Sequence, residues 1–335
     1  MHSTIESFLI KHYGQTAVDS LTLLAESGSS RKYYRFYSAE IPFILTESKN
    51  VAENQTFLYF TQHFSNVMDC FPEIMEVSED FLLYVQSDLG DESLMKLLME
   101  NPQKAKAMFE KSVIQLAQMQ VLGDKDLDYS KCFSYPKFNY LLVLRDLFSF
   151  KNYYLNLVGI EFNHGELLKD FERLALDFEQ ISEQYFVFRD FQSRNIMIHD
   201  GAPYFIDYQG GMKGPVQYDL VSLIWQAKAN LSVEWKADLY ALYQQEFVRL
   251  KPEAFDPIQF KKGYELCLIE RLLQVLGTYG FRGIYEKKTH FLESISFALQ
   301  NLAMVKDLEI LSQYPELQKV MKELALNKEK ITENE

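Results

Sequence analysis

The chain has 335 residues, of which 47% are hydrophobic and 15% aromatic, a composition that supports the large core of a globular protein. Its 34 basic and 47 acidic residues give a formal charge of −13, which repels nucleic acid phosphates and anionic membranes at long range. The start of the chain shows no leader pattern, and no run approaches the roughly 18–20 apolar residues of a membrane span. The 3 cysteines are far apart and predict reduced, buried thiols. We therefore expect a cytoplasmic protein with neither nucleic acid nor membrane partners.

The first part of the chain predicts a small sheet with one helix. Strand patterns occupy residues 21–25, 31–37, 42–46, 72–75 and 81–85. An amphipathic helix is predicted between the third and fourth of these strands, over residues 53–64. Gly28, Ser29 and Ser30 are expected to form the turn between the first two strands. Residues 1–87 are therefore predicted to be a single N-terminal lobe.

A polar stretch from Gln86 to Asp91 interrupts the strand pattern and predicts a hinge. Backbone groups of such a hinge are suited to hydrogen bonding with an adenine edge, which makes Gln86 and Asp88 candidates for nucleotide binding. Helical spacing then dominates, and residues 88–326 are predicted to form a large, mainly helical C-terminal lobe. The charged segment 327–335 is expected to fray. The predicted fold class is α+β, with a small β-rich lobe and a larger helical one.

The helical pattern is broken by a short buried strand and a hairpin. Residues 185–188 are apolar and aromatic, as is typical of a buried strand, and a polar loop follows them. Two further strand-like runs, 196–199 and 203–206, flank Asp200 and Gly201. Because Asp-Gly favours the tight turn of a two-residue hairpin, these runs are predicted to pair antiparallel.

Asn195 and Asp207 lie at the open end of this predicted hairpin. Counting pairs back from the turn places Asn195 opposite Ile206, with Asp207 next in the chain. Opposed positions lie roughly 5 Å apart, so the two side chains can bind one hard cation, and magnesium is the natural occupant. Asp190 comes five residues before Asn195, in the polar loop. The loop is expected to place its carboxylate beside the metal, where it can accept a proton from an attacking hydroxyl.

Three segments resemble motifs of the aminoglycoside phosphotransferase and choline kinase superfamily. They are Arg189-Asp190-Phe191-x-Ser193-Arg194-Asn195-Ile196-Met197, Ile206-Asp207-Tyr208-Gln209 and Gly214-Pro215-x-x-Tyr218-Asp219-Leu220-x-Ser222-Leu223. Within the superfamily the nearest resemblance is to the bacterial anomeric N-acetylmuramate/N-acetylglucosamine kinases. Further segments that fit these kinases are 28–35, 88–91 and 270–277. The resemblance spans most of the chain and is strongest from residue 186 to residue 223.

The resemblance implies a bilobal protein-kinase-like fold and an ATP- and Mg²⁺-dependent kinase whose partner is a small-molecule hydroxyl acceptor. It implies that Asp190 is the catalytic base and that Asn195 and Asp207 hold the magnesium ion. Asp219 precedes an apolar helical run and is expected either to cap that helix or, as its equivalent does in the superfamily, to brace the catalytic loop.

Two sets of binding residues are also expected, one for the nucleotide and one, on the face beyond Asp190, for the acceptor. The candidates for the nucleotide, beside the hinge residues Gln86 and Asp88, are Gly28, Ser29, Ser30, Arg31 and Lys32. The candidates for the acceptor are Arg194, Tyr208, Gln209, Arg271 and Arg282. For the last two arginines, ordinary salt bridges or packing are at least as good an explanation.

The sequence departs from the superfamily's pattern in two places. The position two before the base is usually histidine, whereas Phe188 stands there and can only pack. The third strand, which is expected to carry a lysine for the nucleotide phosphates, contains none. Arg31, Lys32 or Arg35 is expected to supply that charge, and strand alternation allows only one face of the strand to reach the phosphates.

Three functional hypotheses follow. The leading one is a kinase of the anomeric hydroxyl of an N-acetylated amino sugar from cell-wall recycling. The second is a kinase of an aminoglycoside, choline-like or homoserine-like acceptor. The third is a nucleotide-binding pseudokinase, which the missing lysine and Phe188 suggest and the intact base and metal ligands oppose. The acceptor, the nucleotide preference and the oligomeric state stay open at this stage.

Overall fold

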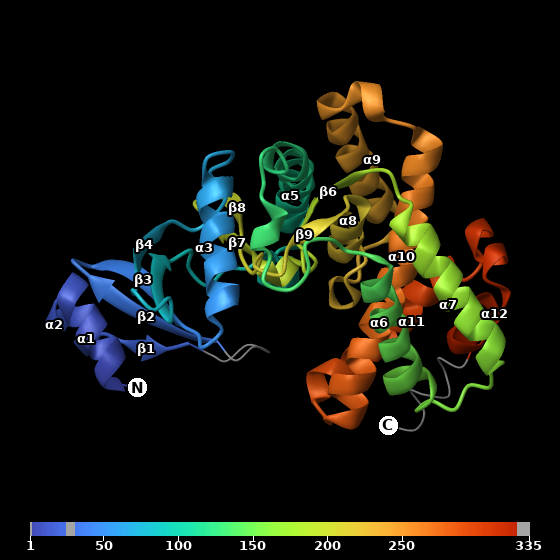
Figure 1. The fold of residues 1–335 in the computed structure, drawn as a ribbon, viewed down its shortest axis with the longest axis horizontal. Coiled ribbons are helices and arrows are strands. Elements are labelled where there is room, and N and C mark those ends of the chain that lie inside the picture. The colour runs from blue at the N-terminus through green and yellow to red at the C-terminus, as the bar shows by residue number, and fades with distance from the viewer. Residues whose placement is uncertain (1, 25–30, 327–335) are drawn as a thin grey trace. The chain divides into compact units, whose positions relative to one another are not determined.

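A computed structural model describes residues 2–24 and 31–326 of the chain (Figure 1). The predicted turn at Gly28, Ser29 and Ser30 and the predicted frayed segment 327–335 lie outside these residues. The chain divides into two compact units. Unit 1 comprises Met1–Ser112, Leu122–Pro136 and Arg194–Gly211, and unit 2 comprises Val113–Val121, Lys137–Ser193 and Met212–Glu335.

A small antiparallel sheet and a mostly helical remainder confirm the predicted α+β fold class. The compact units interleave along the chain, since unit 1 also takes in the hairpin that follows Asp190. The division into lobes at residues 1–87 and 88–326 stays a prediction.

Unit 1 is built around a five-stranded antiparallel sheet with the order β1-β2-β3-β5-β4. The strands are β1 (Thr22–Leu23), β2 (Lys32–Ser38), β3 (Ile41–Glu47), β4 (Ile74–Val77) and β5 (Leu83–Ser87). The helices of this part of the chain are α1 (His2–Tyr13), α2 (Gln15–Asp19), α3 (Val51–Ser65), α4 (Leu94–Glu100) and α5 (Pro102–Gly123), of which α5 continues into unit 2. The structure therefore places a strand or helix at each range predicted for the first 87 residues.

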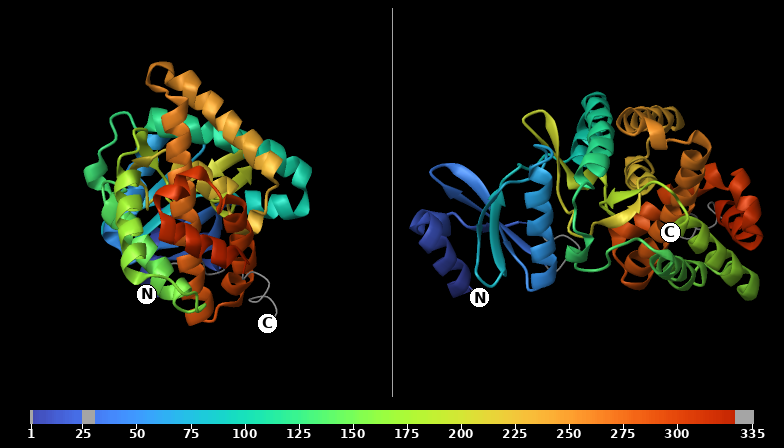
Figure 2. Two further views of the ribbon diagram at one scale, coloured as in Figure 1. Left: turned by 90° about the vertical axis from the view of Figure 1, so that its right-hand side faces the viewer. Right: turned by 45° about the horizontal axis from the view of Figure 1, so that its top comes forward.

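The two faces of this sheet pack on different helices, as Figure 2 shows for α1 and α3. Tyr34 and Phe36 of β2 pack in one cluster with Ile5 and Leu9 of α1. Tyr84 of β5 instead stacks on Phe57 of α3, with ring centroids 5.2 Å apart. Successive strand residues point to opposite faces, so this alternation fixes which side chains of β2 and β3 lie toward α3.

The predicted hairpin is present within unit 1. Strands β7 (Ile196–His199) and β8 (Ala202–Phe205) pair antiparallel in the predicted register, with His199 opposite Ala202. Asp200 and Gly201 have φ angles of 50° and 73°, as a turn that matches the twist of the strands requires. The amide of Phe205 also donates to the carbonyl of Cys70 over 2.8 Å, which joins the hairpin to the rest of unit 1.

Unit 2 is mainly helical. Its helices are α6 (Tyr140–Phe150), α7 (His164–Glu179), α8 (Gln217–Ile224), α9 (Val233–Leu250), α10 (Pro257–Tyr279), α11 (Thr289–Val305) and α12 (Pro315–Leu326). Helix α7 ends at Glu179, and the buried strand predicted over residues 185–188 is present as β6 (Gln184–Val187), which pairs with β9 (Met212–Pro215). The polar loop that contains Asp190 follows β6 directly.

Helices α6 and α10 of unit 2 approach each other closely. A Cβ atom added at Gly277 would lie 2.7 Å from the backbone nitrogen of Phe150. Just beyond the ends of the two helices, one at Gly280 would lie 2.1 Å from the carbonyl oxygen of Tyr153. Only glycine therefore fits at these two positions. This crossing brings Asp146 of α6 and Arg271 of α10 into one polar network.

Within residues 2–24 and 31–326, no helix has both the length and the apolar character needed to cross a bilayer. The three cysteines form no disulfide with one another. Cys70 and Cys267 are buried as predicted, whereas Cys132 is partly exposed.

Candidate active site

Asn195 and Asp207 come together at the open end of the β7–β8 hairpin. The side-chain amide of Asn195 donates to Oδ2 of Asp207 over 3.2 Å, and the amide of Gln209 donates to Oδ1 over 2.8 Å. Asp207 has a φ angle of 63°, an unusual backbone conformation for a residue other than glycine and one that is often found at functional sites. The predicted register therefore does bring these two side chains together, and their role as magnesium ligands stays a prediction.

Asp190 lies in unit 2, in the loop after β6. Arg189, just before it, has a φ angle of 72°. The carboxylate of Asp219 holds this loop, because Oδ2 accepts the amide N–H of Phe188 over 2.7 Å and Oδ1 accepts that of Arg189 over 3.0 Å. The side-chain amide of Gln120 donates to the same carboxylate over 3.1 Å. Asp219 thus braces the loop from inside α8, while the N-cap of that helix is Val216.

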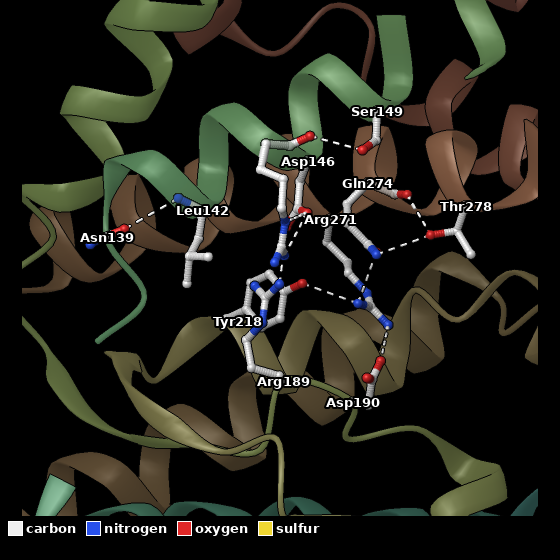
Figure 3. A network of polar contacts seen from close by, with 11 residues as sticks. Asn139, Leu142, Asp146, Ser149, Arg189, Asp190, Tyr218, Arg271, Gln274 and Thr278 are labelled. Atoms are coloured by element: carbon white, nitrogen blue, oxygen red, sulfur yellow. Dashed lines mark hydrogen bonds and ion pairs between the residues drawn. The ribbon is translucent and has the colours of Figure 1, made fainter. Parts of the chain in front are cut away.

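Asp190 faces a buried arginine from α10 (Figure 3). Nη2 of Arg271 lies 3.6 Å from Oδ1 of Asp190, and the exposed fractions of the two side chains are 5% and 55%. Nη1 of Arg271 donates to the hydroxyl of Tyr218 over 3.1 Å and to Oε1 of Gln274 over 3.0 Å. These bonds hold the guanidinium in place, so one carboxylate oxygen of Asp190 faces a cation while the side chain stays accessible to solvent.

Arg189 anchors the same loop on its other side (Figure 3). Its Nη2 donates to Oδ2 of Asp146 over 3.0 Å, and the guanidinium lies 3.8 Å from the centroid of the Phe138 ring. Glu270 is fully buried in α10, and its pKa is raised to about 8 by burial and by the negative charge of Asp146. Burial likewise raises the pKa of Asp219 to about 7. The loop of Asp190 therefore rests on a buried network of charged side chains from three helices.

The basic residues near the start of β2 differ in their partners. Arg35 donates to Asp88 over 3.1 Å and to Asp91 over 2.9 Å, so its charge is held at the predicted hinge. Arg31 lies 3.2 Å from the carboxylate of Glu53 in α3. Lys32 is exposed. The carboxylate of Asp88 accepts from Arg35 and from the amide of Gly90, and a role of the hinge toward adenine stays a prediction.

Comparison with known proteins gives the family. Residues 21–255, more than half of the chain, match the family described as the phosphotransferase enzyme family. The chain belongs to this family. The match confirms the superfamily resemblance that the motifs around Asp190 and Asp207 predict.

Two relatives of this phosphotransferase carry the name N-acetylmuramate/N-acetylglucosamine kinase. The one from Neisseria meningitidis serogroup B is 27% identical over 216 residues, and the match spans 62% of this chain and 62% of that protein. The one from Pseudomonas aeruginosa is 25% identical over 290 residues, which span 82% of this chain and 80% of that protein. Family and relatives together support a phosphotransferase that acts on a hydroxyl group.

A solved structure supports the fold alone. The choline kinase LicA from Streptococcus pneumoniae has a TM-score of 0.60 and 11% identity, and the superposition covers 91% of this chain and 99% of that chain. This likeness confirms the predicted kinase-like fold.

The structure places the candidate acceptor residues of the phosphotransferase in different surroundings. Arg194 is exposed. Tyr208 is fully buried, stacks on Phe57 with ring centroids 4.9 Å apart and shares a 2.5 Å hydrogen bond with Thr61. Gln209 is nearly buried and bonds to Asp207. That Tyr208 binds the acceptor stays a prediction. The complete burial of its side chain does not favour such a role.

Some contacts of the site have no signal in the sequence. Arg282 forms an ion pair with Glu286 over 3.0 Å, which agrees with the alternative that this arginine makes an ordinary salt bridge. Arg271 instead faces Asp190. Phe188 packs between Phe186 and Phe191, so it does fill the histidine position with a purely apolar contact. Nothing in the local pattern distinguishes Arg271 from Arg282, because both lie on helices far along the chain from the loop.

Proposed function

We propose that the protein is an ATP- and Mg²⁺-dependent kinase of a small-molecule hydroxyl, and that its acceptor is the anomeric hydroxyl of an N-acetylated amino sugar. The observation that carries the proposal is the contact between Asn195 and Asp207 at the end of the β7–β8 hairpin. Nδ2 of Asn195 lies 3.2 Å from Oδ2 of Asp207. The names of the two relatives support the acceptor class. A cytoplasmic location stays a prediction.

Asn195 and Asp207 fit a magnesium ion by their chemistry. They offer one carboxamide and one carboxylate, and magnesium in kinases is commonly bound by one or two side chains with substrate phosphates and waters completing the shell. Among the residues that the structure describes, no cluster of three or more His, Cys, Asp or Glu side chains is arranged for a metal. When bound, the ion would neutralise charge on the nucleotide phosphates.

Asp190 is the residue proposed to act on the acceptor. The acceptor oxygen would form a bond to the γ-phosphorus as the bond to ADP breaks, and the hydroxyl proton would go to the carboxylate of Asp190. Arg271 faces Oδ1 of Asp190, and more than half of the carboxylate-bearing side chain is exposed to receive that proton. The carboxylate of Asp219 accepts hydrogen bonds from the backbone N–H groups of Phe188 and Arg189. These bonds keep the loop in one conformation, which favours catalysis by positioning.

The experiment is a product screen. Purified protein is incubated with ATP and Mg²⁺ and a panel of acceptors, namely N-acetylmuramate, N-acetylglucosamine, an aminoglycoside, choline and homoserine, and products are identified by mass spectrometry and ³¹P NMR. The proposal expects a sugar 1-phosphate from the N-acetylated amino sugars. Phosphorylation of another panel member instead would overturn the acceptor assignment.

A thermal-shift series separates the kinase from a pseudokinase. Both are expected to be stabilised by Mg²⁺-ATP, because any ligand that binds only the folded state raises the melting temperature. Stabilisation without any phosphorylated product across the panel would favour the pseudokinase and contradict the proposed function.

A further inference from the structure

Strand β3 has no basic residue, although a kinase needs positive charge beside the nucleotide phosphates. Its sequence is Ile41-Pro-Phe-Ile-Leu-Thr-Glu47. In the protein-kinase arrangement a lysine on this strand pairs with a glutamate of the following helix. Here the following helix is α3, and it carries Glu53 in its first turn. A glutamate is therefore present in the helix that follows, while the strand carries no lysine.

Two of the three basic residues around β2 cannot reach Glu53 on the α3 side of the sheet. Lys32 lies on the same face of β2 as Tyr34 and Phe36, which pack on α1, so its side chain belongs to the face of the sheet away from α3. Arg35 is held by ion pairs with Asp88 and Asp91. Arg31 is the remaining cation.

Arg31 reaches the glutamate of α3. Its Nη2 lies 3.2 Å from Oε1 of Glu53, and the side chains are 2% and 18% exposed. The guanidinium also lies 5.9 Å from the centroid of the Phe57 ring. Oδ1 of Asn50 accepts a hydrogen bond from the backbone N–H of Glu53 over 3.2 Å and so caps α3. This bond fixes the first turn of the helix, which carries the carboxylate of Glu53.

The pair lies near the metal hairpin within unit 1. The ring of Phe57, whose centroid lies 5.9 Å from the guanidinium of Arg31, also stacks on Tyr208 with ring centroids 4.9 Å apart. Tyr208 directly follows Asp207 in the chain. A buried ion pair is costly to desolvate and contributes little net stability, so stability alone is a weak reason for its presence.

We propose that Arg31, held by Glu53, supplies the positive charge beside the nucleotide phosphates that a lysine of the third strand supplies in other kinases. The inference rests on the proposed function, and it chooses one among the three cations that the sequence leaves open. Arg31 is almost wholly buried and acts on the phosphates through its fixed charge, so it is a positioning residue.

The test measures equilibrium binding rather than activity. Affinities of the wild type and Arg31→Gln for Mg²⁺-ATP, ADP and AMP are determined by calorimetry. A charge beside the distal phosphates should matter most for ATP, so we expect Arg31→Gln to weaken ATP about tenfold or more and AMP less than about twofold. Arg31→Lys, which keeps the charge, should recover most of the ATP affinity. An equal loss for ATP and AMP would overturn the proposal.

A second variant keeps the test valid if Arg31→Gln does not fold. The double variant Arg31→Met, Glu53→Gln removes both charges and leaves no unpaired charge in the interior, which such sites tolerate well. It should show the same selective loss of ATP affinity. An unchanged ratio of ATP to AMP affinity in this folded variant would overturn the proposal.

Arg249→Gln is the matched control. Arg249 forms an ion pair with Glu246 over 2.7 Å, but on the surface of unit 2. Its loss should leave all three affinities within about twofold of wild type. A selective loss of ATP affinity in this variant would show that removing any arginine charge produces the effect, which would contradict the assignment to Arg31.

Failure of this inference is distinguishable from failure of the proposed function. A wild-type protein that binds ATP and phosphorylates nothing contradicts the proposed function, while the affinity ratio still tests Arg31. A wild-type protein that phosphorylates an amino sugar, with an affinity ratio that Arg31→Gln does not change, contradicts only the inference.

Discussion

The two regions that carry the proposed chemistry are built in different ways. In the β7–β8 hairpin of unit 1, Asn195 and Asp207 are 12 residues apart and meet because a two-residue turn folds the chain back. The loop of Asp190 in unit 2 is held by Asp219, which lies 31 residues after Phe188, and by Asp146, which lies 43 residues before Arg189. The hairpin region with the proposed metal ligands therefore depends on local pairing, whereas the loop of the proposed base depends on the packing of α6, α8 and α10. Substitutions in the two regions should accordingly fail in different ways.

The largest expected effects come from the two carboxylates themselves. Asp190→Asn and Asp207→Asn should each lower kcat by about 10²–10⁴-fold, the range for removing a proton acceptor or an equally central group. Only Asp207→Asn should also lose most of the melting-temperature increase that Mg²⁺-ATP produces, because it alone removes the negative charge of a proposed metal ligand. Thermal scans with and without Mg²⁺-ATP measure this difference. Equal losses of stabilisation in both variants would erase the distinction between the regions.

Asp219→Ala should produce the next largest effect, on stability. The buried carboxylate accepts two backbone amides and the side chain of Gln120, so its removal leaves donors without acceptors. We expect a loss of about 2–4 kcal/mol in the free energy of unfolding, measured in urea. Asp219→Asn, which keeps the shape and an acceptor oxygen, should lose less. An Asp219→Ala protein as stable as wild type would mean that the loop does not need this brace.

Arg271→Gln should lower kcat by about 10-fold to 50-fold, a smaller effect than loss of Asp190, because it removes the ion pair and keeps the base. Nucleotide binding should be unchanged, since Arg271 belongs to unit 2 and faces the base. Steady-state kinetics and calorimetry with Mg²⁺-ATP check both points. A kcat equal to that of wild type would leave Arg271 a purely structural role.

Glu270→Gln should produce the smallest effect, and one that depends on pH. Burial first, and then the charge of Asp146, raise the pKa of Glu270 to about 8 in the folded protein, well above the usual glutamate value. A raised pKa adds stability that is fully present at low pH and is lost as pH rises through about 8. Replacing Glu270 removes that loss, so the variant should melt about 2–6 °C above wild type at pH 9 and show a smaller difference at pH 6. Calorimetric scans at the two pH values test this, and a constant difference would contradict it.

Prediction from the sequence succeeds where a few neighbouring residues decide the outcome. The alternating strands on either side of Asp200 and Gly201 predict both the turn and the register of the hairpin, which the structure reproduces. It succeeds less well at element ends. The buried strand predicted over residues 185–188 is β6, which runs from Gln184 to Val187 and therefore begins and ends one residue earlier.

The sequence by itself determined the α+β class, the family motifs and the meeting of Asn195 with Asp207, because turn preference and the period of two act over a dozen residues. Only the tertiary structure decided that Asp219 braces the loop, that Arg271 rather than Arg282 faces Asp190, and that Arg31 rather than Lys32 or Arg35 meets Glu53. Each of these contacts joins elements that are distant in the chain. Their geometry depends on how helices and sheet pack, as at Gly277 and Gly280, and no local pattern encodes it.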